Sequence, residues 1–473
     1  MSGLLLLDVQ TMKPPIPENQ TIAAISTPPG AGGIGIIRIS GEHALPILKQ
    51  IFAPADSSCQ FTSHRLYYGS ISEPGSNRLL DEVLVVFMQT PRTYTREDVV
   101  EIHCHGGFLV LQSVIELVLA RGATLAEPGE FTKRAFLNGR IDLTQAEAVI
   151  DILSARTRKG VDLALEQISG TLYKQIESMR ISLVKIRALL EAAIDFPEDE
   201  IEIADHSDLL NQLEIEVLAP LEQLIQNADS GRMVREGVTI VIVGLPNVGK
   251  SSLLNTILQE ERALVTSIPG TTRDTIEEYV DISGIPVRII DTAGIREDVE
   301  EIEQLGIKRA RESINRADLV LFLVDGSREL QAEDRELFTS VAHKPLLTVI
   351  NKCDLKRSIN VSGEPLIFND SIEISALTQL GLTELKTQIF KRITGGKEQW
   401  QEEGVAPNLR QKAAMERAAA SLRLVRDGML HNLTNDLITV DLHESLDHLG
   451  EIVGETTTDD VLDVIFEQFC LGK

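Results

Sequence analysis

The sequence predicts a multidomain protein: an α+β N-terminal domain, then an all-α helical domain with an α/β domain inserted into it. The chain has 473 residues, too many for one ordinary hydrophobic core. Its apolar residues form strand-like runs first, then helical spacing, then alternating strands and helices, and finally helical spacing again. With 43% hydrophobic and 25% charged residues, the chain has a globular composition.

The first 20 residues are expected to be a disordered extension. Four leucines at positions 4–7 lack a basic flank before them and are followed by Asp8, which does not fit a secretory signal. No run approaches the roughly 18 apolar residues that span a bilayer, so we expect no membrane contact.

Residues 21–139 are predicted to form the α+β domain. Gly106 and Gly107 precede one helical run at 109–120. Short strand-like runs separated by turns lie at 21–26, 35–39, 66–71, 83–88 and 99–104.

Residues 140–236 and 397–473 are predicted to be helical. Apolar residues recur at three- and four-residue steps in the first segment, and Pro220 within it should kink or split the helix. The second segment has helical runs at 408–427, 436–449 and 459–469. Neither segment alone offers an obvious closed core, which favours one discontinuous domain over two separate helical appendages.

Residues 237–396 alternate strands and helices, which is typical of a doubly wound sheet. A buried-strand run at 239–243 leads into the loop at 244–251 and a helix at 252–258. This is a phosphate-binding loop in its required context, with glycines that let backbone N–H groups face a phosphate. Lys250 would contact the outer phosphates, and Ser251 would offer a hydroxyl to Mg²⁺.

Two further segments complete the phosphate site. A second strand at 287–290 ends in Asp291-Thr292-Ala293-Gly294, where Asp291 can hold Mg²⁺ through water and Gly294 can offer its N–H to a γ-phosphate. The turn-rich stretch at 270–274 can close over the nucleotide, with Thr272 as a second Mg²⁺ hydroxyl.

The choice of base follows from Asn351-Lys352-Cys353-Asp354 after the strand at 346–350. The Asp354 carboxylate would accept from the N1–H and 2-amino groups of guanine, and adenine would leave it unmatched. Ser375 and Ala376 can brace the base edge. Together these motifs predict an α/β P-loop GTPase domain.

The catalytic group for hydrolysis is less clear from the motifs. Ras-like enzymes orient the attacking water with a glutamine just after Asp-Thr-Ala-Gly, but Ile295 stands here and cannot do so. Five acidic residues follow and are alternatives, although a solvated acidic loop would also explain them: Glu297, Asp298, Glu300, Glu301 and Glu303.

The net charge of −26 makes non-specific binding to nucleic acid over a broad surface unfavourable. A local basic site is conceivable at Lys133, Arg134, Arg140, Arg156, Arg158 and Lys159, although a solvated face is the favoured interpretation.

The cysteines and histidines suggest no metal centre. Four scattered cysteines predict no disulfide framework and a reducing compartment, by default the cytosol. His103 and His105 flank Cys104 on one face of a strand, and we interpret them as strand and turn residues, not metal ligands.

With its GTPase motifs and several further segments, the chain closely resembles the MnmE (TrmE) family of tRNA-modification GTPases. The segments most specific to that family are residues 27–30, 128–131, 134–138, 191–197 and 469–473. The resemblance covers nearly everything after residue 20.

The resemblance implies a folate-binding, dimerising N-terminal domain. It also implies a homodimer in which the two GTPase domains (G domains, residues 237–396) meet, with K⁺ in the role of an arginine finger. It also implies a flavin-dependent MnmG-type partner, in a hetero-oligomer that adds a carboxymethylaminomethyl-type group to the wobble uridine of certain tRNAs. The implied folate is 5-formyl-tetrahydrofolate or a related one-carbon form.

The resemblance also implies individual roles. Hard oxygen ligands suit K⁺ at Asn247, Thr266, Ile268 and Thr271. Mg²⁺ would use Ser251 and Thr272, and Glu303 would be the catalytic, water-orienting residue. Folate contacts would come from Arg38, Glu101, Arg140 and Lys473, and Cys470 is a candidate only. The Arg140 position is often lysine in the family, which changes the donor geometry.

The motifs and the resemblance together predict a long set of GTP-contacting residues. They are Asn247, Val248, Gly249, Lys250, Ser251, Ser252, Thr266, Ser267, Ile268, Pro269, Gly270, Thr271, Thr272, Asp291, Thr292, Ala293, Gly294, Asn351, Lys352, Asp354, Ser375 and Ala376.

Two other functions stay open at this point. A ribosome-assembly GTPase would bind rRNA without modifying it, but such proteins usually carry a second G domain or a basic RNA-binding module, and the sequence shows neither. A regulatory GTPase would use its N-terminal domain only to dimerise.

Overall fold

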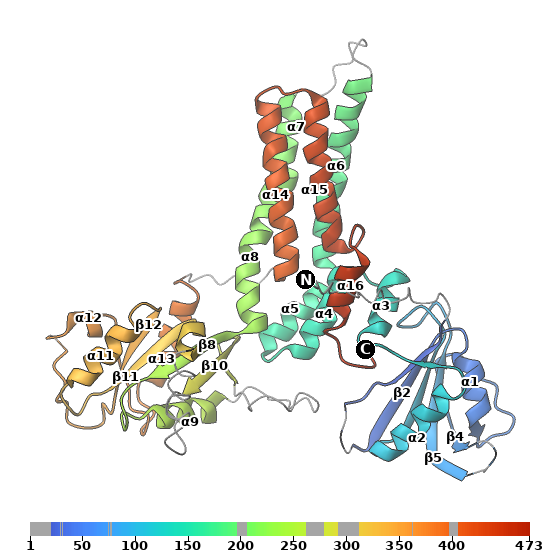
Figure 1. Cartoon of the computed structure of the whole chain (residues 1–473), viewed down its shortest axis with the longest axis horizontal. Helices are drawn as coiled ribbons and strands as arrows, with labels where there is room; N and C mark the ends of the chain where they lie inside the picture. The colour runs from blue at the N-terminus through green and yellow to red at the C-terminus, as the bar shows by residue number, and fades with distance from the viewer. Residues whose placement is uncertain are drawn as a thin grey trace, which may run out of the picture. The chain divides into compact units, whose positions relative to one another are not determined.

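The computed structural model describes residues 20–195, 206–261, 279–291, 312–396 and 405–473, apart from six single positions: Pro29, Ala31, Pro74, Ser76, Asn77 and Ser362. The chain divides into two compact units, the first made of residues 20–142 with 458–473 and the second of the described residues between 143 and 457 (Figure 1). In the described ranges, no helix is both long enough and apolar enough to cross a membrane.

Where the structure describes the first unit, its strands form a seven-stranded sheet in which only the β1–β7 pair is parallel. Helices α1 (Ala44–Ile51) and α2 (Phe108–Leu119) pack their apolar sides on one face and form the core with alternate strand residues. In spatial order, the strands are β3 (Phe52–Pro54), β4 (Arg65–Glu73), β5 (Arg78–Met88), β6 (Val99–His105), β2 (Ile34–Ser40), β1 (Ile22–Ile25) and β7 (Thr124–Leu125). The predicted α+β class is confirmed.

The end of the chain packs within this first unit. Helix α16 (Asp459–Phe466) lies against α3 (Glu130–Leu137), where the Phe466 ring centroid is 6.4 Å from that of Phe136. Lys133 Nζ donates to Asp463 Oδ1 at 2.6 Å. The sequence pattern joins 458–473 to the second helical segment, but their apolar contacts are made with the N-terminal unit instead.

The basic residues of α3 are neither a solvated face nor a nucleic-acid patch. Arg134 is 8% exposed and forms ion pairs with Glu97 at 3.1 Å and Glu130 at 2.8 Å. Lys133 is paired with Asp463. The preference for a solvated face is therefore wrong for these two residues.

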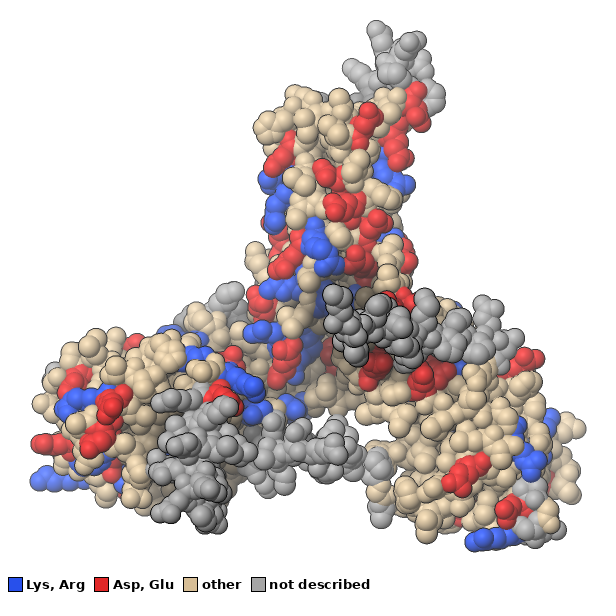
Figure 2. Space-filling view, in the orientation of Figure 1, with Lys and Arg blue, Asp and Glu red and all other residues tan. Residues whose placement is uncertain are grey.

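Figure 2 shows acidic and basic side chains intermixed on the visible face of the helical bundle.

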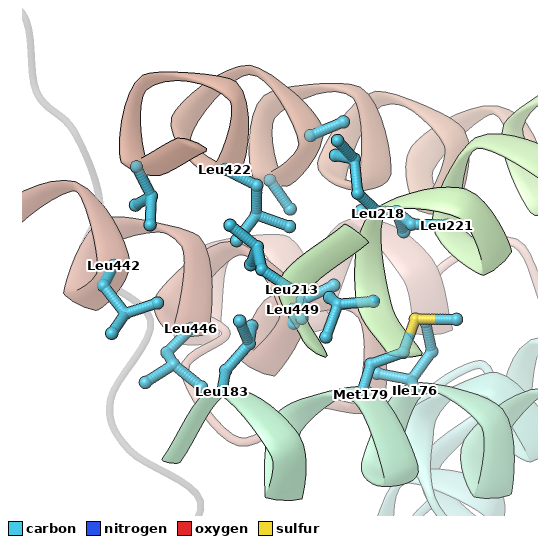
Figure 3. Packing of buried hydrophobic residues seen from close by; sticks show 14 of the residues in the cluster. Ile176, Met179, Leu183, Leu213, Leu218, Leu221, Leu422, Leu442, Leu446 and Leu449 are labelled. Atoms are coloured by element: carbon cyan, nitrogen blue, oxygen red, sulfur yellow. The ribbon is translucent and has the colours of Figure 1, made fainter. Parts of the chain in front are cut away.

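The second unit contains a helical bundle drawn from both sides of the α/β insertion. A single core joins residues of α6, η1 and α8 to residues of α14 and α15, and Figure 3 shows Leu183 and Leu213 beside Leu422 and Leu446. This shared core confirms the predicted insertion. The helices are α4 (Leu143–Ser154), α5 (Arg158–Ile168), α6 (Thr171–Asp195), α7 (His206–Gln212), the π-helix η1 (Leu213–Leu218), α8 (Ala219–Glu236), α14 (Leu409–Leu430) and α15 (Asn435–Val453).

The predicted break at Pro220 takes the form of a π-helical stretch. Residues 213–218 are π-helical, and Pro220 falls in the first turn of α8. Proline has no N–H to donate, so the regular α-helical ladder cannot run through this position.

The described residues of the insertion form a six-stranded sheet, in which only β9 is antiparallel to its neighbour. Its strand order is β13 (Ile372–Glu373), β12 (Leu346–Asn351), β11 (Leu319–Asp325), β8 (Val238–Val243), β10 (Ile285–Asp291) and β9 (Tyr279–Ile282). Helices α9 (Lys250–Glu261) and α13 (Leu382–Ile393) contribute to one core, while α11 (Ala332–Val341) and α12 (Pro365–Phe368) contribute to a second. The α/β class is confirmed.

The chain enters and leaves this insertion beside a buried ion pair. Arg235, near the end of α8, donates to the carbonyls of Ala406 and Pro407, and its Nη1 lies 3.7 Å from Asp151 Oδ2. That oxygen has no hydrogen-bond partner among the described residues. Burial raises the pKa of the Asp151 carboxyl from 3.8 to about 6, although Arg235 opposes the shift.

This raised pKa predicts a pH-dependent stability. The folded protein holds the Asp151 proton more tightly than the unfolded chain does. The stability contributed by protonated Asp151 is therefore full below pH 3.8 and is lost as the pH rises through about 6. Relative to Asp151→Asn, the wild-type free energy of unfolding should fall by about 1–3 kcal/mol between about pH 4 and about pH 7. Denaturant unfolding of both proteins measures this, and equal pH slopes would contradict it.

Candidate nucleotide site

Five strands of the inserted sheet direct their carboxyl ends to one edge. β8, β10, β11, β12 and β13 are mutually parallel, with Asp291 opposite Ile242 and Asp325 opposite Asn351. Ligands of open α/β sheets bind at the carboxyl ends of the strands. The predicted phosphate and base motifs that fall in the described ranges all follow these strand ends.

The phosphate loop connects β8 to α9, which begins at Lys250. Asn247 and Gly249 have positive φ angles of 64° and 101°. A Cβ on Gly249 would lie 2.3 Å from Asn351 Nδ2, and one on Gly244 would lie 2.4 Å from the Leu323 carbonyl oxygen. Glycine is therefore required at both positions, because the loop turns sharply against neighbouring strand ends.

Lys250 and Ser251 stand at the start of α9 in the positions expected for phosphate and Mg²⁺ contacts. Lys250 is 7% exposed, and its Nζ donates to the carbonyls of Gly244 and Leu245, both at 3.0 Å. Ser251 Oγ donates to Asp291 Oδ2 at 2.7 Å. A hydroxyl and a carboxylate at this separation are hard oxygen ligands of the kind that Mg²⁺ prefers.

Asn351 connects three loops of the site. Its Nδ2 donates to the Val248 carbonyl at 2.8 Å, and its Oδ1 accepts from the Ala376 N–H at 3.0 Å. Lys352 Nζ donates to the Asn247 carbonyl at 2.9 Å. The amide and the ammonium thereby hold the phosphate loop against the base-binding segments.

Asp354 and Ser375 occupy different surroundings beside these loops. Asp354 is exposed, so its carboxylate is accessible from solvent. Ser375 is fully buried, and its Oγ accepts from the Thr378 N–H at 3.1 Å. Ser375 thus shapes the loop that carries Ala376, while Asp354 is the group that can reach a base.

Two supporting residues were not predicted from the sequence. Asp325 Oδ2 accepts from Lys352 Nζ at 2.6 Å, and Thr256 Oγ1 donates to the Ala376 carbonyl at 2.9 Å. Burial opposes ionisation of Asp325, but bonds from Lys352 and Ser327 outweigh it and hold the pKa of this carboxyl below its ordinary value. An acidic residue ending the apolar strand 319–325 was the available signal.

Part of the predicted site lies outside the described residues. This applies to the second Mg²⁺ hydroxyl, most of the K⁺ shell and the catalytic glutamate. The residues concerned are Thr266, Ser267, Ile268, Pro269, Gly270, Thr271, Thr272, Thr292, Ala293, Gly294 and Glu303.

Two of the four predicted folate residues come together in the first unit. Arg38 and Glu101 are register partners on β2 and β6, with Arg38 Nε donating to Glu101 Oε1 at 2.9 Å. Arg38 Nη1 donates to the Gly472 carbonyl at 3.3 Å, next to Lys473, and Ser26 Oγ donates to the same carbonyl at 3.1 Å. The chain terminus therefore lies directly against the Arg38–Glu101 pair.

Arg140 and Cys470 have other surroundings. Arg140 Nη1 donates to the Thr93 carbonyl at 3.2 Å, and its guanidinium carbon lies 5.5 Å from the Tyr94 ring centroid. Cys470 is exposed, whereas burial raises the pKa of the Cys104 thiol to about 12. Of these two thiols, Cys470 is the one that solvent can reach.

His103 and His105 do not form a metal site with the other described residues. His105 Nδ1 lies 2.6 Å from Asp81 Oδ1, and the same carboxyl accepts the His105 N–H at 2.8 Å. This contact raises the pKa of the His105 imidazole. Both histidines lie on strand β6.

Two family models together match almost the whole chain after residue 20. The family model described as the GTP-binding protein TrmE N-terminus matches residues 21–140, and the MnmE helical domain matches residues 143–470.

Relatives cover almost the whole chain. The tRNA modification GTPase MnmE of Desulfotalea psychrophila is 57% identical over 96% of this chain and 99% of its own length. The proteins of the same name from Geobacter sulfurreducens and Natranaerobius thermophilus are 48% and 45% identical, again over 96% of this chain and 99% of theirs. The chain therefore belongs to the MnmE family of tRNA modification GTPases.

Proposed function

We propose that this protein binds and hydrolyses GTP and that hydrolysis serves tRNA modification. The observation that carries the GTPase assignment is the convergence of Lys250, the Ser251–Asp291 pair and the Asn351 clamp at one sheet edge. Family membership supplies the link to tRNA modification. Competition between ATP and labelled GTP tests nucleotide binding, and single-turnover assays with MgGTP test hydrolysis.

Each described residue has a definite task in this proposal. Lys250, held over the loop by its two carbonyl contacts, would neutralise charge on the outer phosphates, and the N–H groups at the start of α9 would bind phosphate oxygens. Ser251 and Asp291 would hold Mg²⁺, which would offset the negative charge of the phosphates. Asp354 would bind the guanine edge.

We further propose K⁺ as the charge-stabilising cation of hydrolysis and Glu303 as the residue that orients water. The resemblance to the family supports both roles. Asn247 is the K⁺ ligand within the described loop, and its left-handed backbone conformation suits asparagine. Thr266, Ile268 and Thr271 would complete the shell. Bound K⁺ would supply the positive charge that an arginine finger supplies elsewhere.

This cation proposal predicts that GTP hydrolysis is at least about tenfold faster in KCl than in NaCl at equal ionic strength. Asn247→Gly should lose most of the difference, since glycine keeps the positive φ while removing the side-chain oxygen. Glu303→Gln should slow hydrolysis in both salts. Single-turnover assays measure the rate of GTP hydrolysis for each protein in each salt. Equal wild-type rates in KCl and NaCl would contradict the role of K⁺.

We propose that the exposed face of the N-terminal sheet forms the homodimer contact and holds a one-carbon folate. Exposed apolar side chains lie on neighbouring strands of this face, where Tyr68 is opposite Leu84. Leu66 is opposite Val86, and Val86 is opposite Glu101 of the Arg38–Glu101 pair. A carboxylate such as Glu101 can grip the amide and amine edge of a pterin, with Arg140 and Lys473 as further contacts.

The folate proposal is tested by equilibrium dialysis of the full chain with 5-formyl-tetrahydrofolate. Glu101→Gln should weaken binding by at least about tenfold because the ligand loses a charged hydrogen-bond partner. Glu82→Gln is the matched control, since Glu82 is exposed on the neighbouring strand and accepts from the Tyr68 hydroxyl. Absence of wild-type binding would favour a regulatory GTPase whose N-terminal domain only dimerises.

We also propose which partner protein and which tRNA modification are involved. A flavin-dependent MnmG-type partner would act with this protein in the cytoplasm to add a carboxymethylaminomethyl-type group to wobble uridine. Nucleoside analysis of tRNA from cells lacking this chain, with and without the wild-type protein, tests it. Unchanged wobble uridine in both would favour the ribosome-assembly alternative.

A further inference from the structure

The β9–β10 hairpin has a tightly closed tip. Ser283 and Gly284 form a two-residue turn with positive φ angles of 54° and 90°, between the paired residues Ile282 and Ile285. Such a turn matches the twist of the flanking strands. Asp281 Oδ1 accepts from the Gly284 N–H at 2.6 Å, so the tip has a defined conformation.

The other end of β10 reaches the nucleotide site. Val280, Ile285 and Val287 are fully buried in the core of the inserted domain. At the carboxyl end of β10, Asp291 accepts from Ser251 Oγ at 2.7 Å. Seven residues of extended strand span roughly 20 Å, so one packed element joins the Mg²⁺-binding edge to the hairpin tip.

The tip contacts the helical part of the same unit. Thr157 is 5% exposed, and its Oγ1 donates to the Gly284 carbonyl at 2.9 Å while accepting from the Gly160 N–H as the N-cap of α5. The stem of Lys159 covers the tip, because a Cβ on Gly284 would lie 2.7 Å from Lys159 Cδ.

A second contact holds the start of β9. The guanidinium carbon of Arg156 lies 3.6 Å from the centroid of the Tyr279 ring, close enough for a cation–π interaction. The hairpin is therefore held at the start of β9 by Arg156, at its tip by Thr157, and along its strands by the core of the inserted domain.

Helix α5 continues from this contact into a polar network within the helical bundle. Near its end, Gln167 Nε2 lies 3.3 Å from Gln411 Oε1, and Gln411 Nε2 donates to Glu147 Oε2 at 2.6 Å. Arg410 Nε donates to Glu147 Oε1 at 2.7 Å. The first turn of α14 is thus hydrogen-bonded to α5, the helix whose N-cap residue contacts the hairpin.

We propose that the docking of the β9–β10 tip on Arg156 and Thr157 couples the nucleotide state at Asp291 to α5 and α14. This inference rests on the proposed GTP-dependent function and assigns a regulatory contact to it. Nucleotide-dependent movement of β10 would change its contact with Thr157, and the helical domain would respond through α5. Coupling of this kind is reciprocal, so the contact would also alter nucleotide affinity.

Two substitutions at Thr157 separate coupling from folding. Aspartate retains an oxygen that caps α5 but cannot donate to the Gly284 carbonyl, whereas serine retains both functions. Arg156→Met removes the cation and keeps an apolar stem. The test protein is the double variant Arg156→Met/Thr157→Asp, and Thr157→Ser is its matched control.

Amide hydrogen exchange of the full chain, with GDP or with a non-hydrolysable GTP analogue in KCl, provides the test. In the wild type and in Thr157→Ser, exchange should differ between nucleotides both at residues 244–251 and in α5 and α14. In the double variant, the difference at 244–251 should persist, and the difference in α5 and α14 should be lost.

Each contrary result has a separate meaning. A helical-domain difference that persists in the double variant would overturn the coupling role, as would a wild-type difference confined to residues 244–251. If the GTP analogue left exchange at 244–251 of the wild type the same as in nucleotide-free protein, that result would instead refute the proposed GTP binding, on which the coupling depends.

Discussion

Lys250→Ala is expected to slow GTP hydrolysis by about 10²–10³-fold or more, because loss of one preorganised donor to a developing charge has an effect of that size. Lys250 is buried at the start of α9, and its ammonium is held over the phosphate loop by the Gly244 and Leu245 carbonyls. No neighbouring cation replaces it in the described loop, since Lys352 is bound to Asp325 and the Asn247 carbonyl. Single-turnover hydrolysis of MgGTP measures the effect.

A second lysine provides a matched control for this experiment. Lys344 precedes β12, at the amino end of the strand, and its Nζ donates to the carbonyls of Asn315 and Ala317. Lys344→Ala removes the same charge far from the predicted site and should leave the hydrolysis rate within about twofold of wild type. A Lys250 variant that hydrolyses GTP as fast as this control would remove Lys250 from the mechanism.

Asp354→Asn is expected to weaken GTP binding by about 10²–10⁴-fold, because two hydrogen bonds from guanine to a charged acceptor are lost. The amide of asparagine can instead donate, so the variant should bind xanthosine triphosphate better than the wild type does. Xanthine carries a carbonyl where guanine carries its amino group. Competition between the two nucleotides for each protein measures this exchange of preference.

The control for Asp354 is another exposed aspartate of the same domain. Asp370 forms an ion pair with Arg392 at 3.2 Å and precedes β13 at its amino end. Asp370→Asn should keep the wild-type preference for GTP. If Asp354→Asn behaved like this control, the base would be selected by other groups.

Short-range sequence patterns predicted the strand, loop and helix around Lys250 because these signals are local in the sequence. The order strand, glycine-rich loop, lysine and helix places Lys250 and Ser251 without knowledge of the remaining fold. Asp325 and Thr256 could not be placed in this way. Their roles depend on β11 lying beside β12 and on α9 lying beside the loop at Ala376, which are contacts between segments distant in sequence.

The same distinction explains the errors in the basic segment. Lys133 and Arg134 look like a surface cluster in the sequence, but their partners Asp463 and Glu97 come from other parts of the chain. Helix α16 likewise has an ordinary helical pattern that does not reveal which core it joins. The helical insertion was predictable because each half exposes an apolar face that only the other half could cover.

The central claim is that the carboxyl edge of the inserted sheet is a guanine-selective triphosphate site. Competition of ATP against labelled GTP on the full-length protein with Mg²⁺ tests it most directly. We expect GTP to bind at least about 10³-fold more tightly, since adenine would leave the Asp354 carboxylate without its two hydrogen-bond donors. Equal displacement of the label by ATP and by unlabelled GTP would contradict this account.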